Sequence, residues 1–294
     1  MADAGKKAGS NPALWSGLLF VAGAVLTLYV ASRVQSFLTA NPQLVLPAVS
    51  TGFPIIYFFS AVAVIGLVLL LIPVARLKLV LRVLFVLLYG WSMFIAMWLS
   101  MPLIPAIVLA AAGAIGWFIS PRIWLHDLLL MMAMVTIGAV FGTLLSPWPV
   151  MILLLAASIY DVVAVRFGYM MWMARKLSQT ETLPAFIIPT APANWNLDMR
   201  ASGVQKLLEG ETGEREFSIL GGGDIGFPFV LVVSVFGRHG LTGSVIVAAF
   251  ALAGLFGAYL IQRLFLKGKP MPALPPISFA GLIGLLIVQF VTTR

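Results

Sequence analysis

Two of the ten acidic residues in this 294-residue chain lie inside long apolar stretches. Asp161 is near the middle of one stretch, and Asp224 is in the first third of the next. An aspartate in a membrane span costs about 2.5 to 3.5 kcal/mol, so such a residue faces a cavity or a partner and usually marks function. Two carboxyl groups that share one water also share one proton, which suits them to hydrolyse a peptide bond. The alternative is that each aspartate is a neutral, hydrogen-bonded packing residue.

The residues before the second aspartate are unusual for a helix. Gly221, Gly222 and Gly223 precede Asp224 directly, and each glycine costs about 1 kcal/mol of helix propensity relative to alanine. These glycines either allow close helix packing or let another polypeptide backbone approach the carboxyl group.

A third feature is the segment 269–276, Lys-Pro-Met-Pro-Ala-Leu-Pro-Pro, which has four prolines within seven residues. Such a run excludes a regular helix and leaves carbonyl groups unpaired. Backbone of this kind survives at membrane depth only if it is buried in protein or lines a water-filled cavity. The alternative is an ordinary turn at the membrane surface.

The composition shows that membrane helices must position these residues. Hydrophobic residues make up 61% of the chain and charged residues 10%, whereas soluble domains carry roughly 25% charged residues. The absence of cysteine excludes a disulfide framework, a thiol nucleophile and a Cys-ligated metal. The net charge of +8 does not indicate a nucleic-acid partner, because no basic run is interleaved with aromatic residues.

Cutting the chain at charges and at proline or glycine clusters leaves apolar stretches near the 20 or so residues that span a bilayer. The predicted class is an all-α polytopic membrane protein with nine transmembrane helices. The predicted spans are 13–31, 53–75, 79–99, 103–119, 124–145, 150–172, 218–236, 241–264 and 273–291. The first span is longer than the apolar region of a signal peptide, about 7 to 15 residues, and is therefore expected to be retained.

The positions of the bases predict the orientation. With the N-terminus in the cytoplasm, fourteen of the eighteen Lys and Arg residues lie on the cytoplasmic side, three lie on the opposite side, and Arg166 lies within a span. Cytoplasmic loops are typically enriched in Lys and Arg. The C-terminus is therefore expected on the opposite side of the membrane.

A hydrophilic cytoplasmic segment, 173–217, divides the chain into a six-span part, 1–172, and a three-span part, 218–294. The segment has six acids, five bases and three prolines, a composition that does not favour full order. Most of it is expected to be a solvated linker, with 216–220 reserved for a more specific role. At about 1.5 Å per residue, Asp161 would lie roughly 16 Å below Trp172, and Asp224 roughly 9 Å below Ser218, which allows one common depth.

Three motifs in this order resemble those of a known family. Tyr160-Asp161, Gly221-Gly222-Gly223-Asp224 and Pro272-Ala273-Leu274-Pro275 resemble the YD, GxGD and PAL motifs of the presenilin and signal peptide peptidase group of intramembrane aspartyl proteases. The resemblance covers nearly the whole chain and is closer to the presenilins.

The resemblance implies an aspartic endopeptidase that cleaves transmembrane protein substrates within the lipid membrane and needs no metal or other cofactor. It implies Asp161 and Asp224 as catalytic residues. Tyr160, Gly221, Gly222, Gly223, Pro272, Ala273 and Leu274 are implied to shape the active site and contact substrate. Gly222 departs from the family pattern, where a larger apolar residue is common, and is expected to alter substrate preference. The short loop means that accessory subunits are not evidently required, and self-association to a homo-oligomer stays open.

Other chemistries fit less well. The chain has no HExxH motif, and its two histidines, His126 and His239, have no accompanying set of metal ligands. A catalytic pair of Ser244 and His239 would lie at the membrane edge. The main alternative is a proton- or cation-coupled transporter or channel that uses the two aspartates, although such folds usually have paired broken helices in two repeated halves.

Overall fold

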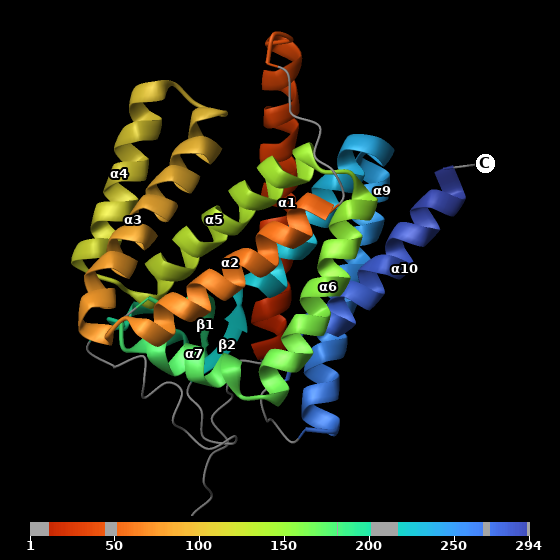
Figure 1. Ribbon diagram of the computed structural model, residues 1–294. Coiled ribbons are helices and arrows are strands. Elements are labelled where there is room, and N and C mark those ends of the chain that lie inside the picture. Colours follow the sequence, from red (N-terminus) through yellow and green to blue (C-terminus); the bar gives the residue numbers. More distant parts are fainter. Residues whose placement is uncertain (1–11, 45–51, 181, 201–216, 267–270, 293–294) are drawn as a thin grey trace, which may run out of the picture.

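The computed structural model describes residues 12–44, 52–180, 182–200, 217–266 and 271–292. These residues form a bundle of helices with a small two-stranded sheet near one end (Figure 1). The helices are α1 (Pro12–Ala40), α2 (Gly52–Leu71), α3 (Val74–Trp98), α4 (Leu103–Ile119), α5 (Ile123–Leu144), α6 (Pro147–Arg166), α7 (Tyr169–Ser178), the short 3-10 helix η1 (Pro192–Asn196), α9 (Gly222–Leu264) and α10 (Leu274–Thr292). Within this described part, seven helices are long and apolar enough to cross a membrane, and α4 is shorter at 17 residues. The chain is therefore a polytopic helical membrane protein, as its composition predicted.

Prolines mark the starts of three of these helices. Pro73 and Pro102 are the N-cap residues of α3 and α4, and Pro147 is at the first position of α6. Proline suits these positions because its φ angle is already helical and its missing N–H would have no partner in the first turn.

Helix α9 reverses direction at Gly240, which has φ 68° and ψ −169°. A Cβ atom built on Gly243 would lie 3.2 Å from a methyl carbon of Val235, whereas residues eight apart on a straight helix are about 12 Å apart. The two arms, 222–239 and 241–264, are therefore antiparallel neighbours (Figure 1). The turn falls between the seventh and eighth predicted spans.

The sixth predicted span, 150–172, was wrong at its C-terminal end. Helix α6 ends at Arg166, and α7 begins at Tyr169 after Gly168, which has φ 70°. This left-handed conformation favours glycine because it has no Cβ. Helix α7 then packs beside α2, where the Lys176 ammonium donates a hydrogen bond to the Leu69 carbonyl.

The segment after α7 is more ordered than its composition predicted. Strand β1 (Ala185–Pro189) is buried along its whole length and pairs antiparallel with β2 (Phe217–Gly221). The register aligns Ala185 with Gly221 and Pro189 with Phe217. The expectation of a solvated linker is therefore wrong for 182–189, whereas 190–200 is mostly exposed or half-buried and 201–216 lies outside the described part of the chain. Residues 217–220 of the reserved stretch belong to β2.

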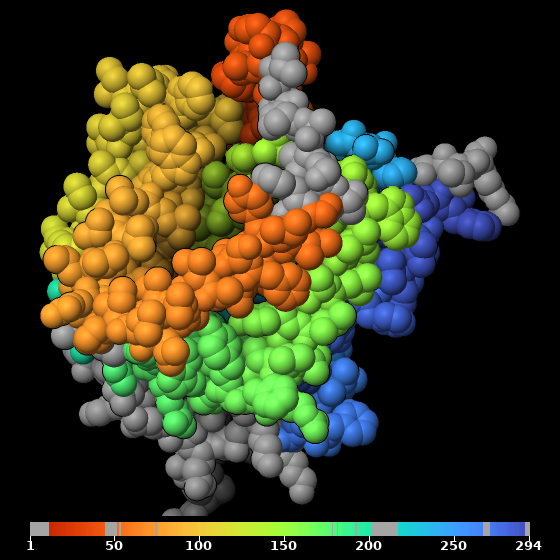
Figure 2. Space-filling view, viewed as in Figure 1, coloured from red at the N-terminus to blue at the C-terminus, as the bar shows by residue number. Residues whose placement is uncertain are grey.

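The main core lies where α1, α5, α9 and α10 meet. Phe20, Leu129, Phe229 and Ile277 come from these four helices and are almost fully buried in one cluster. The rings of Phe20 and Phe229 are 5.4 Å apart. Helix α2 is peripheral by contrast, because only 6% of its apolar stretch is buried, and it lies across the surface in Figure 2. The core helices therefore form a fixed frame, and α2 covers one side of it.

Candidate active site

Asp161 is buried near the C-terminal end of α6 and contacts the start of α10. Its Oδ2 accepts a hydrogen bond of 3.2 Å from the backbone N–H of Leu274, the first residue of α10. First-turn N–H groups have no partner within their own helix, so the carboxyl group acts as a cap for α10. Because α6 ends at Arg166, Asp161 is five residues from the helix end, about 7.5 Å, and the 16 Å depth measured from Trp172 was wrong.

A second hydrogen bond joins α6 to α10, one helical turn from the bond between Asp161 and Leu274. The Ser158 hydroxyl donates to Ser278 Oγ at 2.7 Å, and both side chains are buried. Ser158 precedes Asp161 by three residues, and Ser278 follows Leu274 by four, so the two contacts lie on matching faces of the helices. Together they hold Asp161 and the first turn of α10 in register.

Asp224 is the third residue of α9, directly after strand β2. Gly221 is the N-cap residue of this helix, and its backbone N–H donates to the Asp224 carboxyl group. This bond repeats half of a capping box, in which an acidic or amide side chain at the third helical position caps the N-cap amide. The carboxyl groups of Asp161 and Asp224 are close enough to interact electrostatically. The fold therefore brings the two aspartates of the apolar stretches near each other.

The three glycines before Asp224 have different roles. A Cβ atom on Gly221 would lie 2.9 Å from Asp224 Oδ2, and one on Gly222 would lie 3.0 Å from the Pro184 carbonyl oxygen. That same oxygen accepts the Gly222 N–H at 3.0 Å. A Cβ atom on Gly223 would meet only carbons of Phe227, at 3.4 Å or more. The absence of Cβ thus admits the Asp224 carboxyl group at Gly221 and the Pro184 backbone at Gly222, whereas Gly223 has only ordinary contacts.

The proline-rich segment lies directly against this site. Pro272 and Ala273 precede α10 and are half-buried, and Leu274 is buried. Residues 267–270 lie outside the described part of the chain. A Cβ atom on Gly254, in the second arm of α9, would lie only 2.6 Å from the Pro276 carbonyl oxygen. Backbone packs on backbone here, so this segment is an internal element of the site and not a surface turn.

Tyr160 faces the aromatic side of the site. Its ring is edge-to-face with Phe58 of α2 at 6.0 Å, and Phe58 is edge-to-face with Phe227 of α9 at 5.5 Å. The Tyr160 hydroxyl also interacts electrostatically with Asp161. These three rings form an aromatic cover that joins peripheral α2 to the two helices that carry the aspartates.

A known protein family matches nearly the whole chain, including the three motifs that meet here. The family model described as signal-peptide peptidase, presenilin aspartyl protease matches residues 17–294. The chain belongs to this family. It is therefore an intramembrane aspartyl protease and an integral, multi-pass membrane protein, which sets aside the transporter alternative.

Solved structures with the same fold support the architecture. A presenilin family intramembrane aspartate protease in space group C222 is 20% identical, with a TM-score of 0.60, and the match covers 96% of this chain and 100% of the other. Such a protease in space group P2 is 19% identical, with a TM-score of 0.56, and covers 94% and 96% of the two chains. A comparison with curated proteins gives no match.

Sequence reasoning missed Tyr259 as a site residue of the protease. Its hydroxyl lies 2.6 Å from Ser16 Oγ of α1 and is also hydrogen-bonded to the side chain of Ser218 in β2. It interacts electrostatically with Asp224 as well. A lone tyrosine in an apolar span carries no signal of this role, because its position depends on the reversal of α9 at Gly240.

Sequence reasoning also placed His126 and Asp127 at the edge of the fifth span. Both side chains are buried in the first turn of α5, with exposed fractions of 0% and 3%. Their partners are in strand β1, which the composition of segment 173–217 did not predict. The acid–imidazole pair at the start of an apolar stretch was the one available signal.

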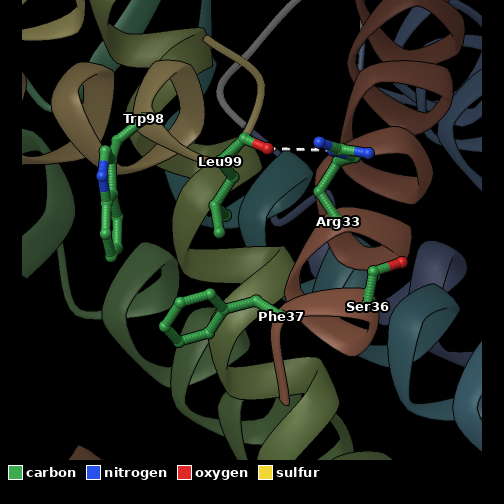
Figure 3. Close-up of a pocket in the computed structure, with 5 residues that line it drawn as sticks. All are labelled: Arg33, Ser36, Phe37, Trp98 and Leu99. Carbon is green, nitrogen blue, oxygen red and sulfur yellow. Dashed lines mark hydrogen bonds between the residues drawn. The ribbon is translucent and has the colours of Figure 1, made fainter. Parts of the chain in front are cut away.

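Figure 3 shows a cavity of about 360 Å³ beside the C-terminal half of α1. It is lined by Arg33, Ser36, Phe37, Trp98 and Leu99. Arg33 Nε donates to the Leu99 carbonyl oxygen at 2.9 Å. Arg33 is 17 residues beyond Ser16, the residue of α1 that touches the site through Tyr259, so about 25 Å of helix separates them. This cavity is not the active site.

Proposed function

We propose that Asp161 and Asp224 are the catalytic dyad of this protease. The main support is that Leu274 of the PAL motif donates its N–H to Asp161, and that Asp161 interacts electrostatically with Asp224 of the glycine motif. Segments more than a hundred residues apart in sequence thus meet at two carboxyl groups.

The dyad holds one proton and activates one water. The ionised carboxyl group removes a proton from water as the water oxygen attacks the scissile carbonyl carbon. The protonated carboxyl group hydrogen-bonds the developing oxyanion and later protonates the leaving nitrogen. Asp161 Oδ1 is buried and accepts no hydrogen bond from the described residues, so this oxygen is available to the water.

A transmembrane substrate must unwind before its carbonyl groups are open to attack, and the unwound strand then needs backbone partners. Strand β2 supplies them on its outer edge. Gly222 donates its N–H to the Pro184 carbonyl oxygen. Because backbone groups alternate between the two edges of an antiparallel strand, the N–H and C=O groups of Leu220 and Ser218 point towards β1. Those of Phe217 and Ile219 point towards the opposite, outer edge. A substrate strand added there lies beside Gly221, whose own N–H binds Asp224. The added strand therefore delivers its carbonyl group to the dyad.

Gly222 and Tyr160 shape the surroundings of this strand. Because Gly222 contacts the Pro184 carbonyl, a larger residue there would displace β1, and the glycine sets a substrate preference different from that of relatives with a larger side chain. Tyr160, with Phe58, covers the site on the side of α2.

The topology of the protease is nine spans, with the N-terminus in the cytoplasm and the C-terminus opposite. This count is supported by seven long apolar helices, by the 17-residue α4 and by the reversal of 43-residue α9 at Gly240. The six-span and three-span parts pack as one membrane domain. Because the chain has no cysteine, Ser100→Cys and Ser120→Cys variants in sealed cells test the topology, and an impermeant thiol reagent should label only the first.

The catalytic proposal is tested with the purified single chain in liposomes and a transmembrane peptide substrate. Asp161→Asn and Asp224→Asn should each abolish cleavage while the solubilised protein stays monodisperse. Asp198→Asn, an acid outside the site that caps the Arg200 amide, is the matched control and should cleave normally. Full activity in either dyad variant would end the proposal.

The same preparation separates the protease from the alternative and tests its partners. Cleavage should continue with a metal chelator and without any added subunit, and the proteoliposomes should show no proton or cation flux. Size-exclusion chromatography with light scattering of the active fraction gives the oligomeric state.

A further inference from the structure

The first turn of α5 holds the outer edge of strand β1 through two side chains. Asp127 Oδ1 accepts the backbone N–H of Ile187 at 3.0 Å. His126 Nε2 lies 3.2 Å from the carbonyl oxygen of Ala185. Both side chains are buried, so these bonds are made where water does not compete for them.

The hydrogen-bond chain settles which nitrogen of His126 carries a proton. A carbonyl oxygen only accepts, so Nε2 must be the donor to Ala185. In the neutral ring Nδ1 is then an acceptor, and the hydroxyl of buried Tyr89, at 3.1 Å, donates to it. Tyr89 of α3 therefore orients the imidazole, and the imidazole holds the strand.

These two contacts lie along the outer edge of the small sheet, on β1. Ala185 and Ile187 point their backbone groups towards α5, while Pro184 points its carbonyl towards Gly222, as alternate residues of a strand must. The edge of β1 is therefore closed to a further strand, whereas β2 has no strand on its outer edge within the described residues.

We propose that His126 and Asp127 are positioning residues of the protease: by clamping β1 they fix the register of β2 and so the place at which substrate is cut. This inference rests on the catalytic proposal above, because it concerns how substrate reaches Asp224. A pair of five-residue strands is marginal by itself, and a slip of one residue would turn every side chain to the other face. Two hydrogen bonds at alternate residues of β1 prevent this slip.

The clamp acts on Asp224 through the chain itself. Strand β1 pairs with β2, and Pro184, the residue just before β1, accepts the N–H of Gly222. Gly222 is the first residue of α9 and lies two residues before Asp224. A shift of β1 would therefore move the outer edge of β2 and the Asp224 carboxyl group together.

The experiment compares variants that remove the clamp with variants that keep it. His126→Phe keeps a planar aromatic ring and Asp127→Leu keeps a side chain branched at Cγ, but neither can hydrogen-bond β1. Asp127→Asn keeps an acceptor oxygen and His126→Gln keeps a donor nitrogen. Thr136→Val, one further buried polar change in α5, removes a 2.9 Å bond to the Ser92 carbonyl of α3 and serves as the control.

Steady-state cleavage of a transmembrane peptide and mass spectrometry of its products are measured for each variant. His126→Phe and Asp127→Leu should lower kcat about tenfold, as expected when buried backbone groups lose their partners. Their KM should change little, and they should cut at one or more neighbouring bonds. Asp127→Asn and His126→Gln should restore the wild-type cut, and Thr136→Val should leave it unchanged.

The inference fails if a folded His126→Phe protein cuts at the wild-type bond with the wild-type kcat. It also fails if Thr136→Val shifts the cut equally, because the effect would then report general loosening of α5. If Asp127→Leu does not fold, His126→Phe decides the matter. Failure of the catalytic proposal looks different, since an active Asp224→Asn protein would overturn that proposal whatever the clamp variants do.

Discussion

Alanine at Gly254 should uncouple the PAL segment from the dyad. The new Cβ would lie 2.6 Å from the Pro276 carbonyl oxygen and 2.7 Å from Ile277 Cα. Both are backbone atoms, so no side-chain rotation relieves the clash. The start of α10 must therefore move relative to α9.

The size of this movement follows from the contact distances. Real Cβ contacts rarely fall below 3.0 Å and are tight up to 3.4 Å, so α10 must retreat by about 0.4 to 0.8 Å. The bond from Leu274 to Asp161 is 3.2 Å long, already at the limit of the usual N–H···O range of about 2.7 to 3.2 Å. Overpacking of this kind destabilises a fold by about 1 to 3 kcal/mol. A loss of about 1.4 to 2.8 kcal/mol of transition-state stabilisation at the dyad lowers kcat/KM about 10- to 100-fold.

Gly257→Ala is the matched control for this change. It lies three residues further along the same helix, and a Cβ atom there meets nothing within 4 Å. Both substitutions gain the same helix propensity, about 1 kcal/mol, so the difference between them isolates the clash. Cleavage of a transmembrane peptide and thermal unfolding in detergent should show Gly254→Ala slower and less stable, with Gly257→Ala near wild type. Equal activity and stability in the two proteins would refute the reasoning.

Three further changes test other contacts of the site. Gly221→Ala places Cβ 2.9 Å from Asp224 Oδ2 and should lower kcat at least about tenfold. Gly223→Ala places Cβ no closer than 3.4 Å to its neighbours and should lower kcat less. A larger loss of kcat in Gly223→Ala would contradict the different roles of these glycines. Tyr259→Phe removes the hydroxyl that bonds Ser16 of α1 and Ser218 of β2 and should lower kcat at least a few-fold, as loss of these hydrogen bonds predicts; an unchanged kcat would exclude a role for the hydroxyl. Phe58→Ala opens the aromatic cover and should change KM for a transmembrane peptide more than kcat, and a change confined to kcat would count against a role in substrate admission.

Position in the sequence was enough to single out Asp161 and Asp224, because the cost of a carboxyl group among apolar residues does not depend on the fold. The meeting of the two carboxyl groups was also expected, since their helices adjoin one loop. The bond between Leu274 and Asp161 was beyond sequence reasoning. It joins the N-terminus of one helix to a side chain of another, and no periodicity records such a contact.

The break between α6 and α7 shows a second limit. Phe167 and Tyr169 flank Gly168, and Arg166 is the one charged residue close to the break. A single charge within an apolar stretch did not divide the predicted span. The helix ends because this one glycine has a φ of 70°. A single glycine within an apolar stretch is common in membrane helices, and the sequence alone does not distinguish a packing glycine from a turning one.

Strand β1 was missed because composition was averaged over the 45 residues of 173–217. Ala185 to Pro189 is a short apolar run inside a polar segment, and such runs of four to eight residues are typical of buried strands. Its burial depends on partners far away in the chain, His126 and Asp127 on one edge and β2 on the other. The local pattern was present, but the contacts that stabilise it are not local.

Both aspartates bind an amide at the start of a helix, and this shared geometry explains why proline and glycine surround them. Asp161 binds the first amide of α10, and Asp224 binds the N-cap amide of α9. Helix starts carry partial positive charge and unpaired N–H groups, so each stabilises a carboxylate where lipid would otherwise disfavour it. Pro275 and Pro276 have no N–H, so Leu274 carries the one backbone donor among the first three residues of α10. The PAL motif thus presents a single amide to the dyad, and the glycine motif presents another without a Cβ in the way. In the proposed mechanism, these two amides together let a membrane protein keep one ionised carboxyl group to activate water.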